Sequence, residues 1–179
     1  MKALTPLGFL LALGSCATLS EEACRGGDWR GVGYRDGAAG RAEGFLSNHA
    51  EACAEYGIAP DVAAWRAGRA EGLRSYCTPA NAFEAGLRGG RLNPVCPPAE
   101  RWRLAAAEER GLRIHGVEVQ IDGLERENRE ARERIDKLLK GEVGPEERRR
   151  IRRLERGIED REQEIRRLER EARHASIGY

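Results

Sequence analysis

Hydrophobic residues recur in steps of three and four along two consecutive stretches in the C-terminal half of the chain. The first series runs Ile114, Val117, Ile121, Leu124, Asn128, Ala131, Ile135 and Leu138. The second series runs Ile151, Leu154, Ile158, Arg161, Ile165, Leu168, Ala172 and Ala175. This spacing predicts two α-helices, each with one apolar seam, because residues three and four apart share a helical face.

The two series mirror each other about the segment 141–145. Leu138 corresponds to Ile151, every following pair keeps the same order, and Asn128 falls opposite Arg161. Glycine ends helices and proline begins them, so Gly141 and Pro145 mark the turn. We therefore expect an antiparallel coiled-coil hairpin within one chain. The alternative is that the two helices pair with other chains.

Helix-capping signals follow one another before this hairpin. Asp28 precedes an expected helix ending near residue 40, and Asn48 with Glu51 forms a capping box for a helix ending near residue 57. Asp61 begins a helix to Tyr76, and Thr78 precedes a proline-started helix that ends near residue 90. No segment alternates like a strand. The sequence predicts an all-α protein, with a small disulfide-bonded helical head (residues 16–98) followed by a long hairpin arm (residues 99–179).

A short repeat of the form aromatic-x-x-Gly runs through the head. Three copies begin at Tyr34, Trp65 and Phe83, and Trp102 begins a weaker fourth copy. Each copy sets a large ring beside a helical groove without a Cβ, and glycine inside a helix costs roughly 1 kcal/mol relative to alanine. Close helix packing is the simpler explanation. The alternative is a ligand-binding groove formed by Tyr34, Asp36, Trp65 and Phe83.

The first sixteen residues carry an export signal. Lys2 precedes an apolar run from Leu7 to Leu13, which is too short to span a membrane, and Leu13-Gly14-Ser15-Cys16 follows the bacterial lipobox pattern. We expect residues 1–15 to be removed and Cys16 to carry the lipid. Ala17, rather than Asp, after Cys16 favours the outer membrane, facing the periplasm. The alternative is an ordinary cleavable signal with a cysteine near its end.

Four further cysteines, Cys24, Cys53, Cys77 and Cys96, predict two disulfides, for which three connectivities exist. Cys24 starts one expected helix and Cys53 ends the next, while the chain returns to Cys77 at Cys96. This order of helices favours the pairs Cys24–Cys53 and Cys77–Cys96. A metal site using His49 and Cys53 is the alternative, but no Cys-x-x-Cys pair supports it, so no metal is expected.

Charge and candidate chemistry narrow the function further. Charged residues make up 34% of the chain, yet the net charge is only +1, which argues against nucleic-acid binding. Asp28 and Asp61 have capping positions, and His49 is expected on a helix surface. No nucleophile with a base, acid pair or phosphate loop is recognisable. We therefore expect no enzyme activity and no cofactor.

The motifs of the head resemble a bacterial family of unknown function. They are Cys24-x-x-x-Asp28-Trp29, Gly33-Tyr34-Arg35-Asp36-Gly37, His49-x-x-x-Cys53 and the stretch from Trp65 to Cys77. The resemblance covers about residues 16–115 and implies a small envelope lipoprotein without a catalytic residue. Our hypothesis is a lipid-anchored structural or interaction protein that meets a protein partner through its arm. The alternative is an envelope glycan-binding module that uses the aromatic-glycine groove.

Overall fold

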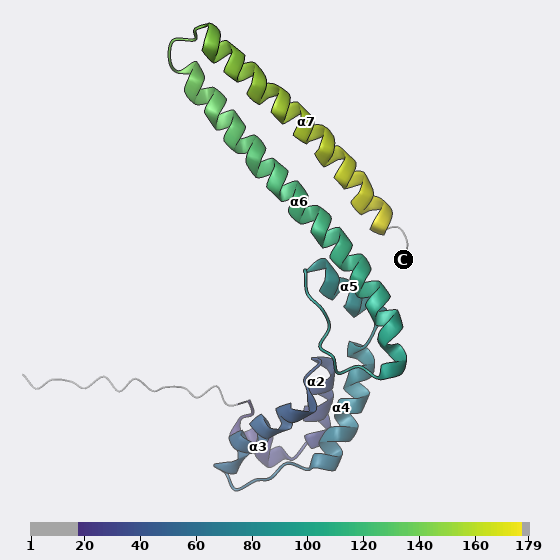
Figure 1. Ribbon diagram of the computed structural model, residues 1–179. Helices are drawn as coiled ribbons and strands as arrows, with labels where there is room; N and C mark the ends of the chain where they lie inside the picture. The colour runs from purple at the N-terminus through teal and green to yellow at the C-terminus, as the bar shows by residue number, and fades with distance from the viewer. Residues whose placement is uncertain (1–17, 177–179) are drawn as a thin grey trace, which may run out of the picture. The chain divides into compact units, whose positions relative to one another are not determined.

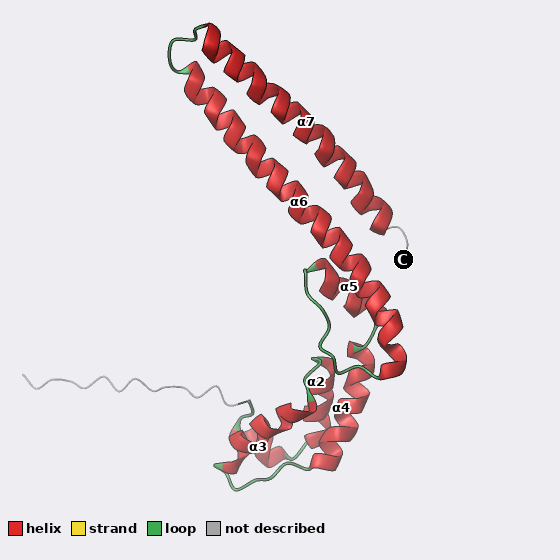
Figure 2. Cartoon of the chain, in the orientation of Figure 1, coloured by secondary structure: helices red, strands yellow, loops and turns green. Residues whose placement is uncertain are grey.

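The structure is a computed structural model that describes residues 18–176, and the described residues form helices and loops without a strand (Figure 2). The α-helices are α1 (Glu21–Gly26), α2 (Trp29–Ala38), α3 (Leu46–Ala54), α4 (Val62–Tyr76), α5 (Pro79–Leu87), α6 (Arg101–Leu139) and α7 (Pro145–Ser176). Two 3₁₀ turns, Glu43–Phe45 and Pro98–Glu100, precede α3 and α6. The predicted all-helical class is confirmed. The predicted signal and Cys16 lie outside the described residues.

Side-chain caps account for most helix starts. The carboxylates of Asp28 and Asp61 each accept the backbone N–H three residues ahead, at 2.9 Å, where α2 and α4 begin. The hydroxyl of Thr78 accepts the N–H of Asn81 before α5. These three predicted starts are confirmed. Ser20 caps the additional helix α1, which the sequence analysis did not identify.

The predicted start of α3 at Asn48 is wrong. Phe45 and Leu46 already have helical backbone angles, because the 3₁₀ turn Glu43–Phe45 continues directly into the helix. Asn48 therefore lies inside α3, where it cannot serve as a cap. Its carbonyl oxygen instead accepts a hydrogen bond from the hydroxyl of Thr18, at 3.1 Å.

The chain divides into two compact units, and the boundary falls inside α4, between Gly72 and Leu73. The first unit has one hydrophobic core, made by Cys24, Trp29, Val32, Cys53 and Trp65. A disulfide joins Cys24 to Cys53 across this core, so the predicted pairing is present. The core therefore links α1, α2, α3 and α4.

The second unit begins with the end of α4 and contains α5, α6 and α7. Its core comprises Ala82, Cys96, Leu104 and Ala107, and the second predicted disulfide joins Cys77 to Cys96. We expected a boundary near residue 98. Helix α5 packs along the first part of α6, so the segment from Leu73 to residue 98 groups with the long helix instead (Figure 1).

Helices α6 and α7 lie side by side and run in opposite directions (Figure 1). Helix α6 has 39 residues, and at 1.5 Å per residue its length is about 58 Å. Ala131, Ile151 and Leu168 from the two apolar series are buried. Among them the guanidinium Nε of Arg161 donates to the amide oxygen of Asn128, at 2.7 Å.

None of the helices in the described part of the chain is both long and apolar enough to cross a lipid bilayer. Helices α6 and α7 have sufficient length, but charged residues interrupt every apolar segment in them.

Candidate functional site

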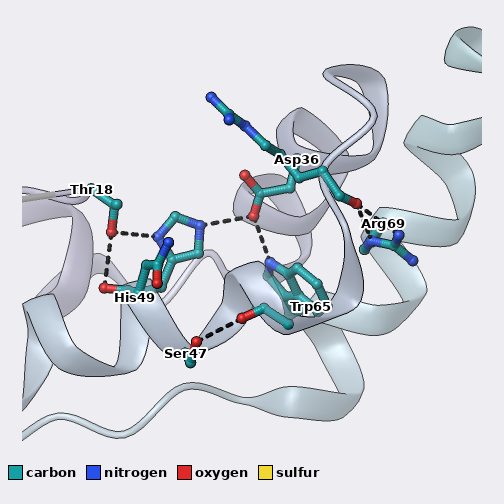
Figure 3. A network of polar contacts seen from close by, with 9 residues as sticks. Thr18, Asp36, Ser47, His49, Trp65 and Arg69 are labelled. Carbon is teal, nitrogen blue, oxygen red and sulfur yellow. Dashed lines mark hydrogen bonds and ion pairs between the residues drawn. The ribbon is translucent and has the colours of Figure 1, made fainter. Parts of the chain in front are cut away.

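A buried polar network occupies the centre of the first unit (Figure 3). One carboxylate oxygen of Asp36, on α2, accepts the indole N–H of Trp65 from α4 at 2.8 Å. The same oxygen lies 2.8 Å from Nε2 of His49 on α3. On the other side of the imidazole, Nδ1 lies 2.8 Å from the hydroxyl of Thr18. Asp36, His49 and Trp65 are all buried, so the network belongs to the core of the fold.

Local packing brings the members of this network together. Helices α2 and α4 cross at Gly33 and Gly68, where the backbones are in direct contact, and this crossing sets Trp65 beside Asp36. The disulfide from Cys24 to Cys53 fixes α3, which carries His49 one helical turn before the bridge. The network is therefore a product of the helix crossing and the disulfide.

The hydrogen bond from Thr18 to the carbonyl of Asn48 determines how Thr18 can interact with His49. A carbonyl oxygen only accepts, so the single hydroxyl proton of Thr18 goes to the carbonyl of Asn48. The imidazole Nδ1 of His49 then faces the oxygen of Thr18, and Nε2 faces the carboxylate of Asp36. Both ring nitrogens and the carboxylate therefore have a hydrogen-bond partner, which is the condition under which polar groups are tolerated in a core.

The order Asp36, His49, Thr18 resembles a carboxylate–imidazole–hydroxyl triad, but the geometry does not activate the hydroxyl. A nucleophile passes its proton to the imidazole, whereas the hydroxyl of Thr18 donates to the carbonyl of Asn48. The indole of Trp65 also engages the carboxylate. This arrangement joins the segment before α1 to three helices, which is a structural role.

His49 was expected on a helix surface, and that prediction is wrong. Its side chain is buried because it faces Asp36, and the ring of Phe45 packs edge-on against it with 5.1 Å between ring centroids. Cys53, its partner in the metal alternative, is in a disulfide. Across residues 18–176, no group of three or more His, Cys, Asp or Glu side chains has a metal-binding arrangement.

The residues of the aromatic-glycine groove are not gathered around an open groove. Trp65 is fully buried and Asp36 is buried beside it, while Tyr34 is 44% exposed. Phe83 belongs to the second unit, where Arg110 lies 5.2 Å from its ring centroid. A Cβ added at Gly68 would collide with the backbone of α2, so a neighbouring helix fills this groove. The structure favours the packing explanation of the repeat.

The second unit contains its own buried carboxylate, which the sequence analysis did not identify. Glu108 on α6 accepts a bond from the guanidinium of Arg91 at 2.6 Å and from the backbone N–H of Leu92 at 2.9 Å. Both donors lie in the loop before the disulfide cysteine Cys96. Glu108 therefore holds this loop against α6. The only sequence signal is an acid at a position where the helical spacing predicts an apolar face.

Trp102 is the most exposed large hydrophobic residue among those described, with a relative solvent accessibility of 73% for the whole residue. It borders a mostly apolar hollow of about 570 Å³ between the starts of α5 and α6. Thr78, Pro79 and Ala106 form other parts of the wall, and Arg103 and Arg110 flank it. The described lining is therefore an apolar contact surface flanked by two arginines.

Comparison with known proteins assigns no activity to these features. No curated protein and no solved structure matches the chain. Residues 28–113 include both helix crossings at glycine pairs and most of both disulfide-bonded segments. The rest of α6 and all of α7 lie outside this range. Residues 28–113 match the model of a family described as a protein of unknown function (DUF2799).

Proposed function

We propose that the chain is a lipid-anchored structural or interaction protein of the bacterial cell envelope, whose helices α6 and α7 form a coiled-coil hairpin that binds a protein partner. The observation that carries the proposal is the bond from Arg161 to Asn128 in the middle of the apolar seam. A buried polar layer lowers the stability of a coiled coil but fixes its register and its partner helix. A long hairpin with a fixed register is suited to presenting a contact surface.

The lipid anchor rests on the lipobox Leu13–Cys16 and on the chain that follows it. Thr18, two residues after Cys16, is bonded to Asn48 and His49, and Leu19 packs against the core of the first unit. Only Ala17 stands between the proposed acylated residue and this bonded segment. Two residues reach at most about 7 Å. The anchor would therefore hold the first unit close to the membrane, without a flexible linker.

The anchor is tested by the mass of the N-terminal peptide and by membrane fractionation. We expect the protein to begin at Cys16 with added acyl mass and to sediment with membranes. Cys16→Ala should abolish both properties. A mature protein that begins elsewhere and carries no acyl mass would refute the anchor.

The arm is tested by a deletion that keeps the rest of the fold. Deleting all residues after Gly111 would remove most of α6 together with both apolar series, and would cut into the part of α6 that packs against α5. We instead remove residues 125–138 and 151–164, two heptads from each helix, which keeps the turn and the phase of both series. Crosslinking to a partner in intact envelopes should be lost in this variant. Crosslinking that survives would assign the partner surface to the disulfide-bonded segments.

A further inference from the structure

Charge is segregated along α6 and α7. The tip, which we define as residues 129–156, contains eleven basic and seven acidic residues. The flanking segments 114–128 and 157–176 together contain six basic and ten acidic residues. The tip is therefore net positive and the base of the arm net negative, a separation hidden by the near-neutral total of the chain.

Four arginines at the tip have no ionic partner in the described part of the chain. Arg149, Arg150, Arg152 and Arg153 are exposed, and none of them lies within 4.0 Å of a carboxylate oxygen there. At the base, Arg167 bonds to both Glu164 and Glu171, and its hydrogen bond lowers the pKa of the Glu164 carboxyl. Arg166, Arg170 and Arg173 are exposed there without such a bond, but acidic residues outnumber basic ones in that segment. The four tip arginines differ from these because they lie within five consecutive positions of a segment whose net charge is positive.

This cluster opposes the stability of its own helix. It lies in the second and third turns of α7, directly after the acidic first turn that contains Glu146 and Glu147. Arg149 and Arg153 are also four residues apart, and like charges at that spacing destabilise a helix. Glu146 and Glu147 offset only part of the charge. A like-charge cluster that lowers local stability points to a use outside the helix.

The form of the cluster identifies the kind of partner. At 3.6 residues per turn the four arginines cover an arc of about 160° on α7, which suits a broad anionic surface better than a single small anion. Residues 103–178 contain no Phe, Tyr or Trp, so the aromatic platforms on which sugars or nucleic-acid bases stack are absent. Clusters of four or more Lys and Arg on a helix attract anionic phospholipids through their phosphates.

We propose that the tip of the arm is a docking surface for a bilayer containing anionic phospholipids, with Arg149, Arg150, Arg152 and Arg153 as the contact residues. Arg148 is excluded because its guanidinium donates to the carbonyl of Val143 and stabilises the turn, at 2.7 Å. The attraction acts over a Debye length and weakens as salt rises. It requires no acyl group, so it is independent of the proposed lipid anchor.

The test is co-sedimentation of the full chain with vesicles of phosphatidylcholine, with and without phosphatidylglycerol. All proteins carry Cys16→Ser, which removes any acyl contribution and leaves every variant with the same N-terminus. We expect binding to need phosphatidylglycerol and to fall with added salt. Changing the four tip arginines to Gln should weaken it at least about ten-fold.

The matched control changes Arg166, Arg167, Arg170 and Arg173 to Gln, which removes the same charge from the base of the same helix. This control should keep most of the vesicle binding, and circular dichroism should show the helical content of both variants. Equal losses in the two variants would overturn the proposal, because binding would then follow net charge alone. Binding to an anionic polysaccharide but not to vesicles would overturn it as well.

Discussion

Gly33 of α2 and Gly68 of α4 face each other, and each lies against the backbone of the other helix. A Cβ at Gly33 would meet the carbonyl of Trp65 and the amide of Arg69. These atoms lie three residues before and one residue after Gly68. Only glycine permits this approach, so the pair fixes the crossing point of the two helices.

Gly86 of α5 and Gly111 of α6 repeat this relationship in the second unit. A Cβ at Gly86 would meet the carbonyl of Glu108 and the amide of Leu112, which are again three residues before and one after the partner glycine. The reverse contact, from Gly111 to Phe83 and Leu87, has the same offsets. Each unit therefore contains one disulfide and one helix crossing at a glycine pair with the same offsets. The crossing of α2 and α4 has a further close approach at Gly72, against the backbone of Tyr34 and Ala38.

The first prediction concerns the glycine pair of the second unit. Gly111→Ala should destabilise the protein by about 1–3 kcal/mol or more, because the added methyl collides with the rigid backbone of α5. Gly116→Ala, in the same helix, meets nothing within 4 Å and should stabilise it by roughly 0.5–1 kcal/mol. Urea unfolding followed by circular dichroism measures both. Destabilisation by both substitutions would refute the close approach at Gly111.

Local signals explain which parts of this fold were predictable. The helix starts at Asp28, Asp61 and Thr78 were predictable, because a cap bonds to a backbone N–H three residues ahead. Both partners of such a contact can be read from four consecutive residues. The partner of the Phe83 repeat was not predictable. The repeat named no partner for Gly86, and the structure uses Gly111, because a helix crossing depends on relative orientation and has no fixed sequence distance.

His49 shows the same limit for the candidate site. A single histidine on a short helix is expected to face the solvent, and the sequence neighbours of His49 give no sign that its side chain is buried. Its burial depends on Asp36 and Trp65, which other helices supply. The glycines at the crossing were recognised as packing positions, but the sequence does not specify which buried polar group the crossing covers.

The second prediction concerns the carboxylate of Asp36. Asp36→Ala removes the acceptor shared by two buried N–H groups and should cost about 3–5 kcal/mol of unfolding free energy. Asp36→Asn keeps one amide oxygen as an acceptor and should cost less. Unfolding in urea, followed by tryptophan fluorescence, measures both.

Asp61→Ala is a matched control for the two Asp36 variants. It removes only a helix cap and should lower the unfolding free energy by about 1 kcal/mol. If Asp36→Ala were no more costly than this capping substitution, the buried network would have no special role in stability.

The third prediction concerns the two disulfides. They close segments with sequence separations of 29 and 19 residues, so loss of chain entropy alone predicts similar stabilisation, about 3–4 kcal/mol each. Replacing Cys24 and Cys53 by Ser should cost more than replacing Cys77 and Cys96. Cys24 and Cys53 are at most 1% exposed, so their serine hydroxyls would be buried, whereas the second bridge lies nearer the surface.

Chemical denaturation of the two double-serine variants measures this difference. Non-reducing peptide mapping of the unaltered protein should recover only the pairs Cys24–Cys53 and Cys77–Cys96. Equal losses would contradict the burial argument, and crossed peptides would contradict the helix order on which the pairing depends.

The fourth prediction concerns the polar layer in the seam. Changing Asn128 and Arg161 together to Leu should raise the melting temperature of the arm, because an apolar layer replaces a hydrogen-bonded one. Asn128→Leu alone should help less, since it removes the acceptor of a half-buried guanidinium. The double variant should also lose its preference for one alignment, which crosslinking at positions outside this layer would reveal as mixed products.

The last prediction tests whether α6 and α7 pair within one chain. Leu124 lies one turn before Asn128, and Ile165 lies one turn after Arg161, so an antiparallel pair brings these two positions to the same level. Cysteines introduced at both should form a disulfide within one chain, even at low protein concentration. Moving one of them to Arg166 turns it by about 100° around α7 and should abolish that product. Covalent dimers whose yield rises with protein concentration would instead establish pairing between chains, and the intramolecular hairpin would be wrong.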